Sequence, residues 1–256
     1  MNLHLCRVAL RPRGPLEVFD LGLALLQAHP GVFFRMALLW VLPVAALGSA
    51  LALLGYGSVA VWSLPVLFAL VQAPVTLLTG RLLFAEGVRV RDVLRELARS
   101  PVSFGAAWLW QTGALALGLL CVGVGAMVSV PATIYVAEAA LLEKVGALSS
   151  LRRSSRLASA NLGNALVASV AWVGLSVWGA LTAEAAGQSI VGFVLQFGAP
   201  FGALQEGDVT PFVVFGLVAA QPLFAVYKLL LYVDTRTRVE GWDLQVGLRA
   251  AGLGGT

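Results

Sequence analysis

Long apolar runs separated by short polar segments dominate the pattern of this chain. Runs close to the roughly 20 residues that a membrane-spanning helix requires lie at 31–54, 58–79, 163–183 and 211–233. The stretch 102–142 contains no Lys or Arg and is long enough for two spans, with a glycine turn at 123–125. Because backbone polar groups must be paired internally in hydrocarbon, the pattern predicts an all-α polytopic membrane bundle of about six transmembrane helices.

One apolar segment, residues 189–204, does not fit this count. It is too apolar for an ordinary exposed loop, yet it is short and broken by Gly198, Pro200 and Gly202. If it were a seventh span, the basic residues that follow it would move to the opposite face of the membrane. We therefore favour a re-entrant or interfacial element, with a seventh span as the alternative.

Composition agrees with a membrane protein, and the distribution of charge predicts its orientation. Hydrophobic residues make up 59% of the 256 residues and charged residues 12%, which is far from the balance of soluble domains. The 17 Lys and Arg residues gather at one end of the predicted spans, whereas the loops at 55–57, 123–125 and 184–210 have none. The positive-inside rule then predicts a multi-pass membrane protein with both termini in the cytoplasm. The net charge of +4 is expected to meet anionic lipid headgroups, not nucleic acid.

Short amphipathic segments precede the predicted hairpins and indicate an internal repeat. The strongest is 90–99, and weaker ones lie at 16–27 and 148–158. We predict three repeat units, 15–80, 88–142 and 146–233, each an amphipathic interfacial helix that leads into a helical hairpin, within one membrane domain 1–256. Chance similarity between amphipathic lead-ins is the alternative. The expected headgroup contacts are the arginines of two of these segments, namely Arg91, Arg95, Arg99, Arg152, Arg153 and Arg156.

Candidate chemistry is sparse. The chain has no familiar catalytic or phosphate-binding signature, and Cys6 and Cys121 provide no framework for a disulfide or a metal site, so we expect no cofactor. Ionisable groups inside a membrane are costly, which singles out Glu138. We expect Glu138 to form an intramembrane charge pair with Lys228 or Arg35. The alternative is that both cations only extend to the interface.

Two other polar features fall within or beside the predicted spans. Gln72, Gln111 and Gln221 lie near mid-span and are expected to form interhelical hydrogen bonds. The charged tail, residues 234–256, is predicted to be cytoplasmic, either as a solvated segment that follows the membrane or as a docking site for a protein partner. The candidate docking residues are Asp234, Arg236, Arg238, Glu240, Trp242 and Asp243.

Three stretches carry a resemblance to known proteins: the lead-in that begins at Asp20, the segment 138–157, and the ending 232–243 with its alternating charges. In these the chain resembles the membrane domain of some glycerophosphodiester phosphodiesterases and the YciC-like inner-membrane proteins. The resemblance implies a multi-pass protein of the bacterial cytoplasmic (inner) membrane. Because some such proteins are encoded beside MoxR-type ATPases, it also implies a role in assembly. The chain has no phosphodiesterase barrel, so that activity is not implied.

The leading functional hypothesis is a non-enzymatic membrane scaffold or assembly subunit of a bacterial envelope complex, with the bilayer and membrane or cytoplasmic proteins as partners. A transporter or lipid-handling protein is the alternative, because repeated units and mid-span glutamines are features of transporters. A membrane-embedded enzyme ranks third, with Glu138 and Glu184 as its only candidate acids. The sequence leaves the oligomeric state open.

Overall fold

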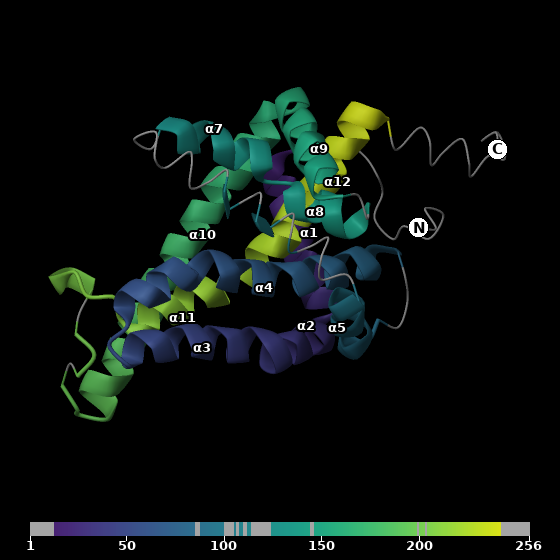
Figure 1. Ribbon diagram of the computed structural model, residues 1–256. Coiled ribbons are helices and arrows are strands. Elements are labelled where there is room, and N and C mark those ends of the chain that lie inside the picture. The colour runs from purple at the N-terminus through teal and green to yellow at the C-terminus, as the bar shows by residue number, and fades with distance from the viewer. Residues whose placement is uncertain are drawn as a thin grey trace. The chain divides into compact units, whose positions relative to one another are not determined.

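The computed structural model describes residues 13–84, 88–99, 105, 108–109, 112–113, 124–143, 146–198, 200–202 and 204–241 (Figure 1). Every regular element in these ranges is a helix, so the predicted all-α class is confirmed for them. The helices are α1 (Pro15–Ala28), α2 (Pro30–Met36), η2 (Ala37–Val41), α3 (Leu42–Leu53), α4 (Gly57–Phe84), α5 (Val90–Arg99), α7 (Val124–Thr133), α8 (Val136–Leu142), α9 (Ala147–Ala160), α10 (Leu162–Gln188), η3 (Ser189–Val194), η4 (Leu204–Glu206), α11 (Pro211–Ala219) and α12 (Gln221–Glu240).

Four continuous helical stretches are long and apolar enough to cross a membrane. They are Pro30–Leu53, Gly57–Leu83, Leu162–Val194 and Pro211–Glu240, and they contain most or all of the predicted spans 31–54, 58–79, 163–183 and 211–233. The apolar helical stretch Val128–Leu142 is shorter, and most of the predicted third span lies outside the described residues. The structure thus shows four candidate spans, and the total of six stays a prediction.

The chain divides into two compact units. Unit 1 comprises Met1–Val32, Ala73–Val170 and Ala225–Thr256, and unit 2 comprises Phe33–Gln72 and Ala171–Phe224. The division runs through α2, α4, α10 and the start of α12, so it cuts across the proposed repeats 15–80 and 146–233.

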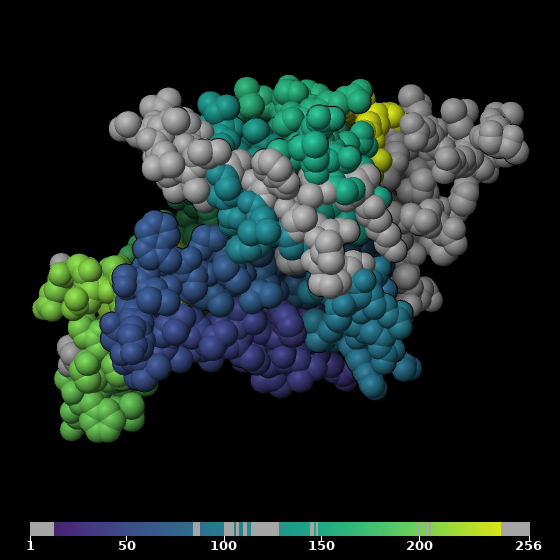
Figure 2. Space-filling view, viewed as in Figure 1, coloured from purple at the N-terminus to yellow at the C-terminus, as the bar shows by residue number. Residues whose placement is uncertain are grey.

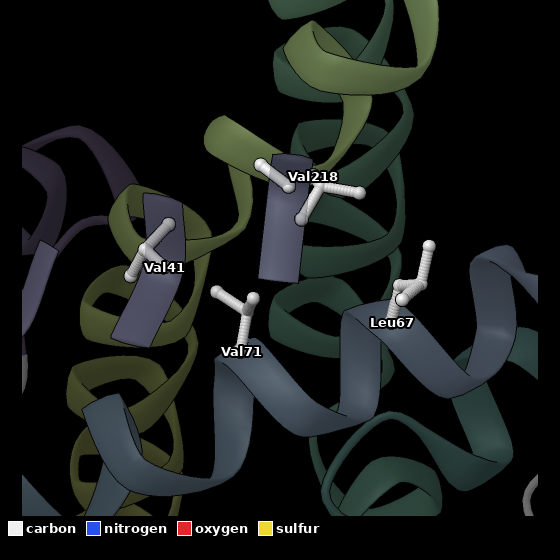
Figure 3. Packing of buried hydrophobic residues seen from close by; sticks show 5 residues of the cluster. Val41, Leu67, Val71 and Val218 are labelled. Carbon is white, nitrogen blue, oxygen red and sulfur yellow. The ribbon is translucent and has the colours of Figure 1, made fainter. Parts of the chain in front are cut away.

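In unit 2, apolar side chains of α3, α4 and α11 and of the π-helical turn η2 interlock. Val41, Leu67, Val71 and Val218 form its buried cluster together with Ala45 (Figure 3). The packing is close, because a Cβ added at Gly48 would lie 2.7 Å from the Leu67 side chain and 3.0 Å from that of Val214. Close apolar packing, for which Gly48 leaves room, therefore joins these helices.

A second close approach in unit 2 brings α10 against α11. A Cβ added at Gly179 would lie 2.6 Å from the carbonyl oxygen of Gly216 and 2.7 Å from the Cβ of Ala220. Only glycine at both positions permits this backbone-to-backbone contact, which is the usual role of small residues at helix interfaces in membranes.

In unit 1, α1 packs against α12 through a face centred on Val18 and Gly22. A Cβ added at Gly22 would lie 3.6 Å from both Val226 and Leu230, and the Phe19 and Tyr227 rings meet edge to face with centroids 5.4 Å apart. Leu16, on another side of α1, is 82% exposed. One side of α1 therefore packs against α12, and a different side, which carries Leu16, is exposed.

The segment 189–204 forms no separate spanning helix within its described residues. Its first part continues α10 as the π-helical η3, and the chain then turns back through Gly198 and Gly202, both of which have positive φ. Glycine adopts positive φ without the steric cost that a Cβ brings, so Gly198 and Gly202 allow the chain to turn at these points.

Candidate functional site: a buried charge pair and its polar surroundings

Glu138 on α8 and Lys228 on α12 form an ion pair in the interior of unit 1. The Lys228 Nζ lies 3.1 Å from the Glu138 Oε1, and the two side chains are 1% and 0% exposed. No hydrogen bond from another described residue reaches the Glu138 carboxylate, so its charge is balanced mainly by Lys228. Each charge makes the other tolerable, because a buried ion without its partner carries a large desolvation cost.

The core of unit 1 contains many other buried polar side chains. The Tyr135 and Tyr232 rings lie 5.7 Å apart between centroids, and both side chains are essentially fully buried. Such a core is unusual, since buried polar groups are costly unless they are bonded. The buried polar and charged residues of unit 1 are Thr76, Thr79, Thr133, Glu138, Ser150, Ser154, Asn164, Lys228, Asp234, Thr235 and Thr237.

A break in the helical hydrogen-bond pattern precedes Glu138. In an unbroken helix the Tyr135 N–H would bond to the carbonyl oxygen of Pro131, four residues earlier, but Ile134 bonds there instead. Ser154 of α9 repairs the break. Its Oγ accepts a hydrogen bond from Tyr135 N at 3.1 Å and donates one to the Ala132 oxygen at 2.9 Å. The side chain of α9 thereby fixes where α8 begins and how Glu138 is presented.

A second cluster, which we call the arginine–carboxylate network, consists of Glu143, Arg153, Arg236 and Glu240. Arg153 Nε lies 3.2 Å from Glu143 Oε2, and Arg153 Nη2 lies 2.5 Å from Glu240 Oε1. Arg236 also contacts both carboxylates, at 3.2 Å and 2.9 Å, and the Tyr232 hydroxyl donates to Glu143. The network joins the end of α8 to α9 and to the last turns of α12.

Arg153 stays charged in this network. Burial alone would lower the pKa of its guanidinium, but the carboxylates of Glu143 and Glu240 outweigh burial and hold the pKa above its ordinary value. The ion pairs therefore persist at every pH at which the two carboxylates are ionised.

A third cluster, which we call the N-terminal clasp, ties the start of the described chain to α12. The Asp234 carboxylate accepts hydrogen bonds from Arg13 N at 2.8 Å and from Asn164 Nδ2 at 2.9 Å. Arg238 bonds to the same carboxylate at 2.8 Å and to the Arg13 carbonyl oxygen at 2.5 Å. These contacts fix the segment before α1 and the start of α10 against the end of α12.

Unit 2 has its own polar centre at Gln221. The Gln221 Oε1 accepts from Gln72 Nε2 at 2.8 Å and from Trp172 Nε1 at 3.3 Å. Its Nε2 donates to Ser176 Oγ at 3.2 Å and to the Leu217 carbonyl oxygen at 2.8 Å. The bonding capacity of this amide is thus largely used between helices, as expected for Gln72 and Gln221, while Gln111 lies outside the described residues.

The remaining predicted site residues fall into three groups. Arg35 is exposed at the end of α2 in unit 2, so the structure pairs Glu138 with Lys228. Of the predicted headgroup contacts, Arg153 is engaged in the network, and those exposed on α5 and α9 are Arg91, Arg95, Arg99, Arg152 and Arg156. Of the predicted docking tail, four residues belong to the network or the clasp, and Trp242 and Asp243 lie outside the described residues.

Several residues that carry these clusters were missed by the sequence analysis. Glu143 lies beside a predicted span, Ser154 lies between two, and Asn164 lies at the start of the predicted span 163–183. Arg13 was counted in the sequence analysis only among the basic residues. One pattern in the sequence could have indicated the ion pairs at the end of α12. Asp234 and Arg238 are four residues apart, as are Arg236 and Glu240, and this spacing places each pair on one face of a helix.

Comparison with protein-family models, with curated proteins and with solved structures finds no match to this chain. Among the described residues, no group of three or more His, Cys, Asp or Glu side chains is arranged to hold a metal ion.

Proposed function

We propose that this protein is a non-enzymatic assembly subunit of a bacterial envelope complex, embedded in the inner membrane. The observation that carries the proposal is the joining of the network and the clasp at the end of α12. Together they fix the segment before α1, the end of α8, α9 and the start of α10 to a single helix. A surface fixed in advance loses little conformational entropy when a partner binds, which is what a docking platform requires.

In the proposed arrangement the chain crosses the membrane six times with both termini in the cytoplasm. The helices α1, α5 and α9 are then interfacial. Support comes from α5, where Val90 and Val93 are buried while Arg91, Arg95 and Arg99 are exposed, and from the exposed Leu16 of α1. Arginines at this level would contact anionic headgroups. Reporter fusions after residue 256 and within 55–57 test the arrangement, which predicts cytoplasmic and external reporters respectively.

Affinity purification from native membranes with quantitative mass spectrometry tests the assembly role. We expect a stoichiometric protein partner with the unchanged chain and with Arg152→Ala, whose side chain is exposed. We expect Arg153→Ala to lose that partner, because it opens the network, while membrane abundance is retained. A chain recovered alone from native membranes contradicts the proposal.

A second candidate function, a transporter or lipid-handling protein, is favoured by the Glu138–Lys228 pair beside a broken helix. Intramembrane ionisable residues mark substrate or proton pathways in many transporters, and broken helices line their binding sites. Ion-flux and lipid-scrambling assays in proteoliposomes test this candidate. Activity that disappears in Glu138→Gln and is retained in Arg35→Gln would favour it over the assembly role.

The likeness to YciC-like inner-membrane proteins and to the membrane domain of glycerophosphodiester phosphodiesterases remains part of this proposal. It is carried by the lead-in that begins at Asp20 and by the segments 138–157 and 232–243. The last two segments both contribute residues to the network. From this likeness we adopt only the role in assembly.

A further inference from the structure

The end of α10 carries a group of large apolar side chains that unit 2 leaves uncovered. We call it the apolar tip, and it consists of residues on η3 and in the turn that follows. Figure 1 shows this end of α10 extending beyond the end of α3, and in Figure 2 it lies at the lower left. The exposed fractions are 54% for Ile190, 87% for Phe193, 69% for Val194, 49% for Leu195 and 71% for Phe197.

Polar groups at the base of the apolar tip bond to one another. The Glu184 carboxylate accepts hydrogen bonds from the Thr210 hydroxyl, from Gln188 Nε2 at 3.1 Å and from Leu204 N at 3.4 Å. Gln188 also donates to the Gly202 carbonyl oxygen at 2.8 Å. Internal satisfaction of polar groups is required where water is scarce, whereas an ordinary loop in water could leave these groups to solvent.

The backbone of the turn is bonded in the same manner. Leu195 N donates to the Ile190 oxygen at 2.9 Å, and Phe197 N donates to the Val191 oxygen at 3.0 Å. Gln196 between them adopts a positive φ of 56°, a conformation that costs energy for a residue with a side chain. The turn is therefore a defined structure that holds Phe193 and Phe197 outward.

Within unit 2, α10 also exposes large apolar side chains before the apolar tip, namely Val173, Val177, Trp178 and Leu181. The exposed hydroxyls of Thr182 and Ser189, which lie between Leu181 and the tip, bond back to the carbonyl oxygens of Trp178 and Ala185. The helix Leu162–Val194 has 33 residues, or about 50 Å at 1.5 Å per residue. A tilt of roughly 30° accommodates that length within the about 40–45 Å of a bilayer with its headgroups, inside the range of tilts that membrane helices adopt.

Charge also bears on what covers the apolar tip. Residues 184–210 contain no Lys or Arg, so nothing there would draw the tip to anionic headgroups or to an acidic protein. Glu206 and Asp208 are exposed beyond the tip and mark the side that meets water. Apolar surface at the end of a spanning helix, with its polar groups bonded inward, fits the boundary between headgroups and acyl chains.

We propose that the apolar tip inserts into the bilayer at the end of α10 opposite α9, where lipid acyl chains cover Phe193 and Phe197. The segment 189–204 is then an interfacial wedge of the membrane protein and not a water-exposed loop. This inference rests on the proposed membrane embedding of α10.

Photo-crosslinking in native membranes tests the inference. The photoreactive amino acid p-benzoylphenylalanine replaces Phe193, and in a second variant Phe197, and the adducts are identified by mass spectrometry. Both positions are exposed, so the replacements leave the core unchanged. We expect lipid adducts at both positions, in yields comparable to those at Val177 in mid-helix and several-fold above those at Glu206.

The controls separate the inference from the proposed embedding on which it rests. Lipid adducts at Val177 without lipid adducts at positions 193 and 197 overturn the inference and leave the embedding intact. A protein adduct at position 193, whether a second copy of this chain or another protein, also overturns it. Absence of lipid adducts at Val177 removes the embedding and the inference together.

Discussion

The Lys228 ammonium lies 3.1 Å from the Glu138 carboxylate, and neither side chain has access to the surface of unit 1. Lys228→Met leaves the carboxylate buried without its partner, so we expect a loss of about 3–5 kcal/mol in stability. The double variant Glu138→Gln with Lys228→Met removes both charges and should recover most of that loss. Thermal unfolding in detergent, followed by size-exclusion chromatography, measures both.

Arg35→Met is the matched control for this pair, because Arg35 is exposed. It should unfold at the temperature of the unchanged chain. A double variant no more stable than Lys228→Met alone would show that the unpaired Glu138 carboxylate is not the cause of the lost stability.

Ser154→Ala should lower stability by about 1–3 kcal/mol, because it leaves Tyr135 N and the Ala132 oxygen without their partner. Ser155→Ala, one residue further along α9, alters a hydroxyl that is exposed and bonds only locally to Arg152. Hydrogen exchange of the 132–136 amides distinguishes the two, since only Ser154→Ala should accelerate it. Equal exchange in both variants would contradict the role assigned to Ser154.

Gly179→Ala should drive α10 and α11 apart, because the new Cβ would lie 2.6 Å from the Gly216 oxygen. Overpacking of this kind costs about 1–3 kcal/mol. Gly174→Ala places the same methyl group on the same helix with nothing within 4 Å, and it should be neutral or slightly stabilising. Thermal unfolding of the two variants side by side checks the prediction, and an equal response would argue against the close approach.

Gln72 and Gln221 should be coupled energetically through the 2.8 Å hydrogen bond between their side chains. A double-mutant cycle with Gln72→Ala and Gln221→Ala isolates that term. Interhelical hydrogen bonds in membrane proteins average about 0.6 kcal/mol and reach about 1.7 kcal/mol, so the coupling should lie in this range. Strict additivity of the two single variants would indicate that the bond contributes nothing.

Arg153→Ala should destabilise the protein by about 1.5–3 kcal/mol, because it removes charge-assisted bonds to two carboxylates. Arg152→Ala, at an exposed neighbouring position, should change stability by less than about 0.5 kcal/mol. Unfolding monitored by tryptophan fluorescence compares them. Similar losses in the two variants would mean that the network is not the source of the effect.

The helices that could be predicted from the sequence are those that follow from a continuous run of apolar residues. The run 58–79 has the length and hydropathy of a membrane-spanning helix, and in the structure this helix extends over Gly57–Leu83. The pairing of Glu138 could be anticipated because a lone carboxylate in an apolar run requires a partner. The choice of Lys228 over Arg35 depends on how α8 and α12 pack, and no local pattern encodes that packing.

The network and the clasp could not be predicted for the same reason. Glu143 and Arg153 come together with Glu240 only after α8, α9 and α12 have packed, although Glu240 is remote in sequence. Asp234 likewise looked like part of a solvated tail. The structure shows instead that α12 continues to Glu240 and uses this carboxylate internally.

The bond between Ser154 and the broken segment before α8 has a consequence for synthesis of the protein. Tyr135 N and the Ala132 oxygen leave the ribosome before Ser154 does, so their native partner does not yet exist when they emerge. The segment 124–142 can reach its final geometry only after α9 has been translated and has folded back upon it. These bonds therefore require α7, α8 and α9 to fold together, and the break before α8 cannot reach its native geometry helix by helix.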